Sequence, residues 1–193
     1  EAALATREEA DLGDEGRIPP DLTDAGGRLT TSWIDDVLSR DERARPYMAT
    51  RMPSFGAENT GHLAALFAAS AGASNLLDAE PEFSSAHARA GRTLVGSKGL
   101  DCIRCHEIAG RDSTGTPGPD LALMPGRLRP RYFQRWLHDP TRLVPGSRMP
   151  RFFVLGMSER TEVLGGRAQG QIDAIWSYLS QGDALALPDG LLD

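Results

Sequence analysis

Five consecutive residues constrain this chain more than any others, Cys102-Ile103-Arg104-Cys105-His106. Two cysteines separated by two residues and followed at once by a histidine form the C-x-x-C-H pattern, which attaches a c-type haem. The two thiols lie one helical turn apart, so each can bond covalently to a vinyl group of the same porphyrin. His106 then lies under the iron as its proximal ligand. The sequence therefore predicts one covalent haem held by Cys102, Cys105 and His106.

A C-x-x-C pair alone has other uses, as a redox dithiol, a structural disulfide or half of a zinc site. Zinc would need two further ligands, and outside the motif the chain has no cysteine and only His62, His87 and His138. A thioredoxin-like dithiol would need a βαβ pattern around it, whereas the flanks of this motif are typical of helices. Haem attachment is therefore the favoured reading of the pair.

A second motif lies downstream, in Pro145-Gly146-Ser147-Arg148-Met149-Pro150. Together with C-x-x-C-H it resembles the class I cytochromes c, over about residues 85–182. The resemblance implies an all-α, cytochrome c-like fold with long loops around the haem, and Met149 as the sixth ligand of the iron. A neutral thioether opposite a neutral imidazole leaves the iron low-spin and favours the ferrous state. The flanking prolines stiffen the loop that holds Met149.

Two alternatives remain for the sixth position. Met149 can be an ordinary core residue, since methionine fills irregular apolar gaps. His138 could replace it as ligand, but its place at the end of a helix favours a surface role or a contact with the helix dipole.

The chain also contains an internal repeat with a small indel. Two short segments return 99 positions later: Pro20-Asp21-Leu22 as Pro119-Asp120-Leu121, and Gly27-Arg28-Leu29 as Gly126-Arg127-Leu128. A third returns 97 positions later: Arg51-Met52-Pro53-Ser54-Phe55 as Arg148-Met149-Pro150-Arg151-Phe152. In the same frame Trp33 and Leu38 fall near Tyr132 and Leu137.

The repeat predicts two tandem modules. Residues 1–80 form a degenerate cytochrome c-like module with a linker, and residues 81–193 form the cytochrome c domain with its covalent haem. The first copy lacks C-x-x-C-H, which the repeat would place near Ala3–Arg7. We expect a haem-free copy that keeps its methionine loop as a packing element. The alternative is a haem-binding front half located upstream, in which case Met52 would ligate a second haem.

Apolar periodicity and capping residues predict the helices. They are expected within Glu1–Leu12 and at Thr31–Leu38, about Gly61–Ala71, about Ser85–Gly96, Pro130–His138 and about Gly166–Ser180, with a linker at Ser70–Pro81. In the second of these helices Trp33 and Ile34 begin an apolar stripe, and in the third Leu63, Leu66 and Phe67 should face a core. In the cytochrome pattern the helix before the motif crosses the last helix, and Gly91 would permit this close approach to Trp176 or Tyr178.

The resemblance also assigns residues around the haem. A carbonyl at or beside Pro119 would accept a hydrogen bond from the His106 ring and fix its tautomer. The Gly110–Pro119 loop would wrap the haem edge. Four further side chains are expected at the pocket or its propionates: Arg127, Tyr132, Trp136 and Arg148. For the arginines the alternative is an ordinary solvated surface.

Charge is uneven along the chain, which has a net charge of −6. Residues 1–84 carry 16 acidic and 7 basic side chains, whereas residues 85–193 carry 11 and 14. The basic half is expected either to dock an acidic redox protein by electrostatic steering or to be covered by the acidic half. We expect no nucleic-acid partner, and membrane association only through another segment or partner. No signal peptide is visible, and because haem is attached outside the cytoplasm, we expect a mature or excised chain in the periplasm or another extracytoplasmic space.

These features predict an electron-transfer protein and not an enzyme. Iron closed by His106 and Met149 has no open position for oxygen or peroxide, which suits one-electron carriage. The carrier could stand alone or form a domain of a larger respiratory or dehydrogenase assembly. The alternative from another class is a haem-based sensor in which Met149 dissociates and a gas binds the iron. A peroxidase fragment is a third reading, disfavoured by the single motif and the closed coordination.

Overall fold

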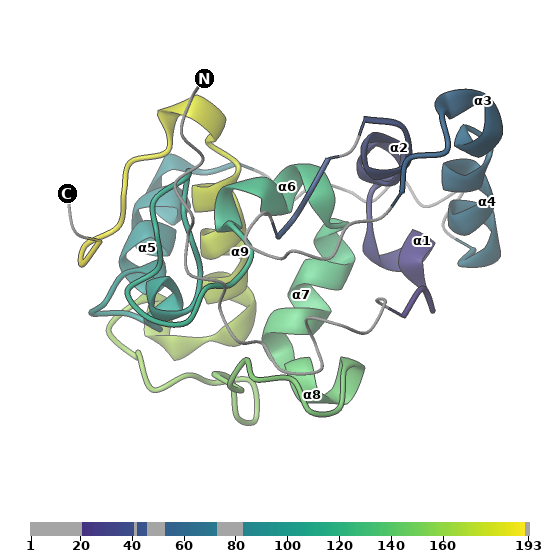
Figure 1. Cartoon of the computed structure of the whole chain (residues 1–193). Helices are drawn as coiled ribbons and strands as arrows, with labels where there is room; N and C mark the ends of the chain where they lie inside the picture. The colour runs from purple at the N-terminus through teal and green to yellow at the C-terminus, as the bar shows by residue number, and fades with distance from the viewer. Residues whose placement is uncertain (1–20, 41, 46–52, 73–82, 192–193) are drawn as a thin grey trace, which may run out of the picture.

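The computed structural model describes residues 21–40, 42–45, 53–72 and 83–191. In chain order its helices are α1 (Ala25–Arg28), α2 (Thr31–Arg40), α3 (Ala57–Thr60), α4 (Leu63–Ser70), α5 (Ser85–Val95), α6 (Met124–Arg127), α7 (Pro130–His138), α8 (Pro140–Leu143) and α9 (Ala168–Leu179). Within these ranges β-structure is limited to isolated bridges. Helices α1 to α4 lie on one side of α7, and α5 and α9 lie on the other (Figure 1). The all-α class is therefore confirmed.

The predicted helices inside the described ranges are confirmed to within a few residues. Ser84 caps α5, because its side chain accepts a hydrogen bond from the backbone N–H of His87 at 3.4 Å. The expected helix in Glu1–Leu12, the position Ala3–Arg7, Met52 and most of the linker at Ser70–Pro81 lie outside the described residues. No helix of the described part is both long and apolar enough to span a bilayer.

Helices α5 and α9 form the central crossing of the second module. A Cβ added to Gly91 would collide with the carbonyl oxygen of Ala174 and would lie 2.7 Å from the Cβ of Tyr178. Glycine is therefore required for the two backbones to lie this close. The predicted crossing at Gly91 is confirmed, with Tyr178 as the side chain beside it.

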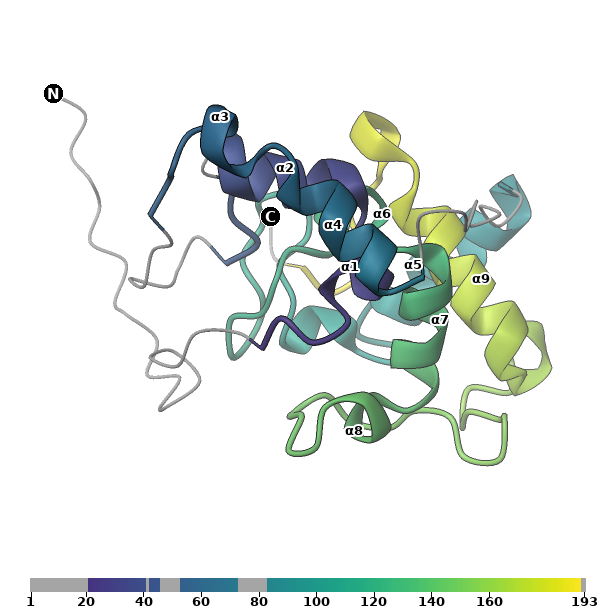
Figure 2. The same cartoon turned by 90° about the vertical axis from the view of Figure 1, so that its right-hand side faces the viewer.

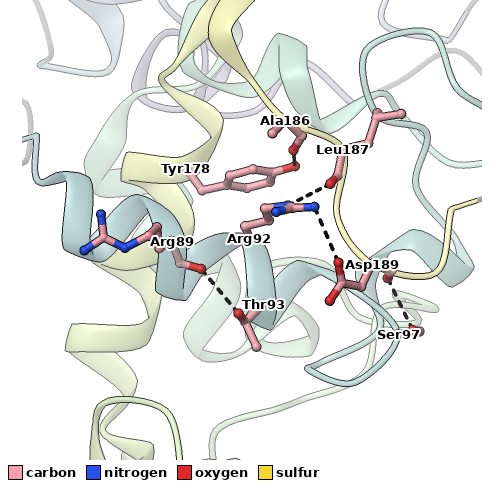
Figure 3. Close-up of polar contacts among 8 residues, drawn as sticks. All are labelled: Arg89, Arg92, Thr93, Ser97, Tyr178, Ala186, Leu187 and Asp189. Carbon is pink, nitrogen blue, oxygen red and sulfur yellow. Dashed lines mark hydrogen bonds and ion pairs between the residues drawn. The ribbon is translucent and has the colours of Figure 1, made fainter.

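The C-terminal segment closes over this crossing (Figure 3). The Tyr178 hydroxyl donates to the carbonyl of Ala186 at 2.7 Å, and the Arg92 Nε–H donates to the carbonyl of Leu187 at 2.7 Å. Arg92 also pairs with the Asp189 carboxylate at 3.4 Å, and the Ser97 backbone N–H donates to the Asp189 carbonyl at 2.9 Å. Residues 186–189 thus link α9, through Tyr178, to the C-terminal end of α5.

The two copies of the internal repeat contact each other through matching positions. Leu29 and Leu128 form an antiparallel β-bridge. The N–H of Thr30 donates to the carbonyl of Arg127 at 2.9 Å, and the N–H of Arg129 donates to the carbonyl of Arg28 at 3.0 Å. Because the repeat offset here is 99, each bond is the counterpart of the other. The two repeat copies are therefore related at this bridge by an approximate local two-fold axis.

Packing of the first module differs from the prediction at α4. Trp33 and Ile34 of α2 are buried as expected, but α4 buries Ala64 and Ala68. Leu63 and Phe67 are half-buried, whereas Leu66 is 58% exposed, so the prediction that Leu66 faces a core is wrong. The small alanines lie toward α1, where a Cβ on Gly26 would collide with the Phe67 carbonyl. This close approach turns Leu66 outward.

The crossing predicts unequal effects of two glycine substitutions. Gly91→Ala should lower the free energy of unfolding by about 1–3 kcal/mol, because the added methyl forces the α5 and α9 backbones apart. The control is Gly170→Ala in α9, where a Cβ would meet only the Leu164 side chain at 3.9 Å. This change should raise stability by about 0.5–1 kcal/mol through helix propensity. Denaturant unfolding measures both, and equal losses would contradict the crossing.

Tyr178 predicts a loss of stability in alkali. Burial raises the pKa of its hydroxyl from 10.0 to about 12, while the Arg92 charge acts weakly in the opposite direction. The neutral phenol therefore stabilises the fold fully below about pH 10, and this contribution declines as the pH rises from about 10 to 12. Tyr178→Phe should cost about 1 kcal/mol near neutral pH and flatten that alkaline decline. Stability curves for the two proteins that stay parallel from neutral pH into this range would contradict the assignment.

Candidate functional site

One apolar cavity lies between the C-x-x-C-H turn, α7, the loop Pro145–Pro150 that carries Met149 (the methionine loop) and α9. It encloses about 350 Å³ of empty space, including the part that opens to solvent. Its walls are Leu100, Cys102, His106, Leu121, Phe133, Leu137, Met149, Phe152, Ile175 and Leu179. The site therefore combines a motif cysteine, the motif histidine and the loop methionine with a wall of aliphatic and aromatic carbon.

His106 is held in one orientation by two contacts. Its backbone N–H donates to the carbonyl of Cys102 at 2.9 Å, the same carbonyl that accepts from Cys105 at 3.1 Å to close the short 3₁₀ turn Cys102–Arg104. Its ring Nδ1 lies 2.8 Å from the carbonyl oxygen of Pro119. A carbonyl only accepts, so Nδ1 carries the proton and Nε2 keeps a lone pair. Burial is the main influence on this ring and lowers its pKa, which favours the neutral form.

The segment that carries the Pro119 carbonyl is fixed by its neighbour Asp120. The Asp120 carboxylate accepts backbone N–H bonds from Ala109 at 3.0 Å, Gly110 at 2.8 Å and Ala122 at 2.8 Å. At Gly118, a Cβ would collide with the Cys105 carbonyl and lie 3.2 Å from His106 Nδ1. The turn after the motif therefore has room for a glycine only. The Gly110–Pro119 segment has no helix, as predicted.

The two cysteines occupy different environments. Cys102 is half-buried and lines the cavity, whereas Cys105 is exposed, and both thiols are free. Burial raises the pKa of the Cys102 thiol to about 12. Such a thiol remains protonated at neutral pH, unlike the activated thiolate of a redox dithiol.

Met149 lines the cavity from a loop that lies 43 residues after His106 in the sequence. Its Sδ accepts a hydrogen bond from the indole Nε1–H of Trp136 at 2.9 Å. Its backbone N–H donates to the Ser147 hydroxyl at 3.2 Å. Trp136 in turn stacks on Tyr132, with ring centroids 6.1 Å apart and planes inclined by 21°. The thioether is thus anchored to α7 through one aromatic pair.

The other predicted site residues lie outside the cavity wall. Tyr132 is buried in the core, and Arg148 is exposed. The Arg127 guanidinium lies 6.0 Å from the ring centroid of Trp33, at the contact between the modules. The His138 ring is 6.0 Å from that of Phe153. Contacts of Arg127 and Arg148 with propionates therefore stay predictions.

Seven wall residues were not proposed as site residues from the sequence: Leu100, Leu121, Phe133, Leu137, Phe152, Ile175 and Leu179. Their apolar character marks them as core residues, and nothing in a single sequence separates a cavity wall from solid packing. The internal repeat carried one usable signal, because Leu121, Leu137 and Phe152 all belong to repeated segments.

The donor set fits an iron porphyrin better than a bare ion. Within the described ranges, no three His, Cys, Asp or Glu side chains lie close enough together to hold a metal ion. A haem iron brings four nitrogen ligands of its own, so one imidazole and one thioether complete it. The glycine at position 118, the oriented imidazole and the apolar wall satisfy these needs.

No family model, curated protein or solved structure matches this chain.

The Asp120 contacts predict that this carboxylate stabilises the turn beneath His106. Asp120→Ala should lower the free energy of unfolding by about 1.5–3 kcal/mol, because three N–H groups lose a charged acceptor. Hydrogen exchange at Ala109 and Gly110 should accelerate. The control is Asp183→Ala at an exposed position, which should change neither quantity by much. Unchanged exchange in the Asp120 variant would contradict this role.

Proposed function

We propose that this chain is a c-type cytochrome that carries single electrons outside the cytoplasm, with a cytochrome c-like fold around one covalent haem c. The observation that carries the proposal is the convergence of two sequence motifs, 43 residues apart from His106 to Met149, on one apolar cavity. The chain would hold the porphyrin through Cys102 and Cys105, and the iron through His106 and Met149.

The bound haem supplies a one-electron couple, and the surrounding residues set its conditions. The Pro119 carbonyl holds the proton on His106 Nδ1 and leaves Nε2 available. The Trp136 indole donates to the Met149 thioether and would hold it ready to ligate the iron. The aliphatic and aromatic walls would limit the contact of a bound haem with water, which favours the less charged, ferrous state. With both His106 and Met149 as ligands the iron would have no open position, which favours electron transfer over oxygen or peroxide chemistry.

The proposed partner is a redox protein with an acidic surface. Five exposed arginines lie in α7, in α8 and beside Met149: Arg131, Arg135, Arg142, Arg148 and Arg151. Arg151 pairs with Asp139 at 3.6 Å, and the charge of Arg142 acts on the same carboxylate, so Arg131, Arg135 and Arg148 are the arginines proposed for steering. Exposed charges of this kind raise association rates at low ionic strength and contribute little at high salt.

Absorption spectra with iron counted per chain test the proposal directly. One low-spin haem with the weak long-wavelength band of a ferric thioether ligand, indifferent to CO when reduced, is the expected result. A haem that binds CO under native conditions would instead favour the sensor. A purified, correctly matured chain without covalent haem would overturn both.

Met149→Ala should abolish the long-wavelength band, admit CO and lower the reduction potential, because the iron loses its thioether. Met157→Ala is the matched control: Met157 is 44% exposed and lies eight residues further along the same segment. Retention of the wild-type spectrum and potential by the Met149 variant would show that the ligand assignment is wrong.

Trp136→Phe should keep the haem low-spin but lower its reduction potential. The indole N–H withdraws electron density from the sulfur and so favours ferrous iron; without it the thioether becomes a better donor to ferric iron. Tyr132→Phe, which keeps the stacked ring and removes no donor from the sulfur, should have a smaller effect. Equal potentials for wild type and the Trp136 variant would show that the indole only packs.

A further inference from the structure

The cavity wall has two parts, and the internal repeat copies only one of them. Leu100, Cys102 and His106 come from the segment before residue 107, which has no copy in residues 21–72. The other wall residues belong to the repeated part. Leu121, Phe133, Leu137 and Phe152 correspond to Leu22, Ile34, Leu38 and Phe55.

The correspondence continues through α4. Gly61-His62-Leu63 aligns with Gly170-Gln171-Ile172, and at the same offset of 109 both helices end together, α4 at Ser70 and α9 at Leu179. Ile175 of the cavity wall therefore corresponds to Leu66. Ala174 and Tyr178, which touch the crossing at Gly91, correspond to Ala65 and Ala69.

Local geometry supports the alignment. Asp21 accepts the N–H of Thr23 at 2.8 Å, as Asp120 accepts that of Ala122 at 2.8 Å. Helices α1 and α6 have equivalent bounds, and the reciprocal bonds at Leu29 and Leu128 join equivalent atoms. The two segments are therefore equivalent in structure as well as in sequence.

Solvent exposure is what separates the copies. Leu22 is 59% exposed where Leu121 is 9% exposed, and Leu66 is 58% exposed where Ile175 is 3% exposed. Phe55 is 62% exposed, while its counterpart Phe152 lines the cavity. These three are the exposed large apolar side chains of the described part of the first module. Each one matches a cavity-wall position, so the exposed apolar surface is not distributed at random.

The face of α4 that matches the α5 contact is also exposed. Ala65 and Ala69 face solvent, whereas Ala174 and Tyr178 are buried under α5. In Figure 2, α4 lies in front of α1 and α2, and no other described helix lies in front of it. Among the described residues, this surface thus has no counterpart of α5 or of the C-x-x-C-H turn.

We propose that the described residues 21–40 and 53–72 belong to the back half of a second haem site, completed by a polypeptide front half of the same chemistry as residues 83–119. This front half is a helix with a small residue at its crossing, followed by a C-x-x-C-H turn with haem attached. The inference rests on the proposed function. It replaces the expected haem-free packing element, because a packing element would bury Leu22, Phe55 and Leu66. Met52 lies outside the described residues, and the inference does not use it.

The test adds a haem peptide to the full chain. The peptide comprises residues 83–119, with haem bound through Cys102 and Cys105. Titration should show saturable binding, followed through the change in absorption of the peptide haem as it leaves water. Leu22→Asp and Leu66→Asp in the full chain should each weaken binding about tenfold or more, because each places a charge where the bound peptide would bury an apolar side chain. The control is Leu155→Asp, at a side chain that is 94% exposed in the second module and should leave binding unchanged.

A covalent fusion of the peptide to the chain tests the case in which the free peptide binds too weakly to be detected. A copy of residues 83–118 replaces residues 1–19, so that it leads directly into Pro20, the counterpart of Pro119. The tether raises the effective concentration without adding a contact. A second covalent haem per chain whose absorption changes on Leu66→Asp, and not on Leu155→Asp, supports the proposal.

The opposite results overturn it. They are a peptide that fails to bind together with a tethered haem whose absorption does not respond to Leu66→Asp, or binding that is indifferent to Leu22 and Leu66. Failure of the proposed function is seen separately, because the unmodified chain would then lack its own haem in the first spectrum.

Discussion

The contact between two helix backbones at Gly91 is the constraint on which the candidate site depends. It brings α5 onto Ala174, and the chain reaches Cys102 only seven residues after α5 ends at Val95. The Leu100 N–H, bonded to the Leu94 carbonyl at 2.6 Å, leaves this connection little freedom. Because α9 supplies Ile175 and Leu179 to the cavity, the same crossing sets the distance between the motif and the opposite wall.

Two hydrogen-bond acceptors, the Pro119 carbonyl and the Asp120 carboxylate, fix the segment around His106. The Pro119 carbonyl determines which nitrogen of His106 carries the proton, and Asp120 holds the turn that supplies this carbonyl. Asp21 makes the equivalent bond to its own following turn, but in the described residues it lacks the N–H partners that the motif loop gives Asp120. The same Asp-anchored turn thus occurs in both copies of the repeat, and the loop after C-x-x-C-H gives the second copy two further N–H bonds.

Sequence alone predicts the local part of this structure. Helix α7 matches its predicted bounds because proline, apolar periodicity and the helix end are all encoded nearby. The contact of His106 with Pro119 and the crossing at Gly91 follow from family resemblance, not from periodicity. The cavity wall could not be derived, because its residues come from separate segments that meet only in the fold. Leu66 was misassigned because periodicity identifies an apolar face but not whether another helix covers it.

The contact at Leu29 and Leu128 has the form of an isologous interface, in which the same surface patch is used on both sides. Such contacts are typical of symmetric homodimers, where one patch pairs with its own copy. Here both copies lie on one polypeptide, and the two reciprocal bonds use only backbone atoms. Side chains at Arg28 and Arg127 are therefore not required for those bonds. The pairing therefore tolerates changes of side chain in either copy, because it depends on the backbone of both.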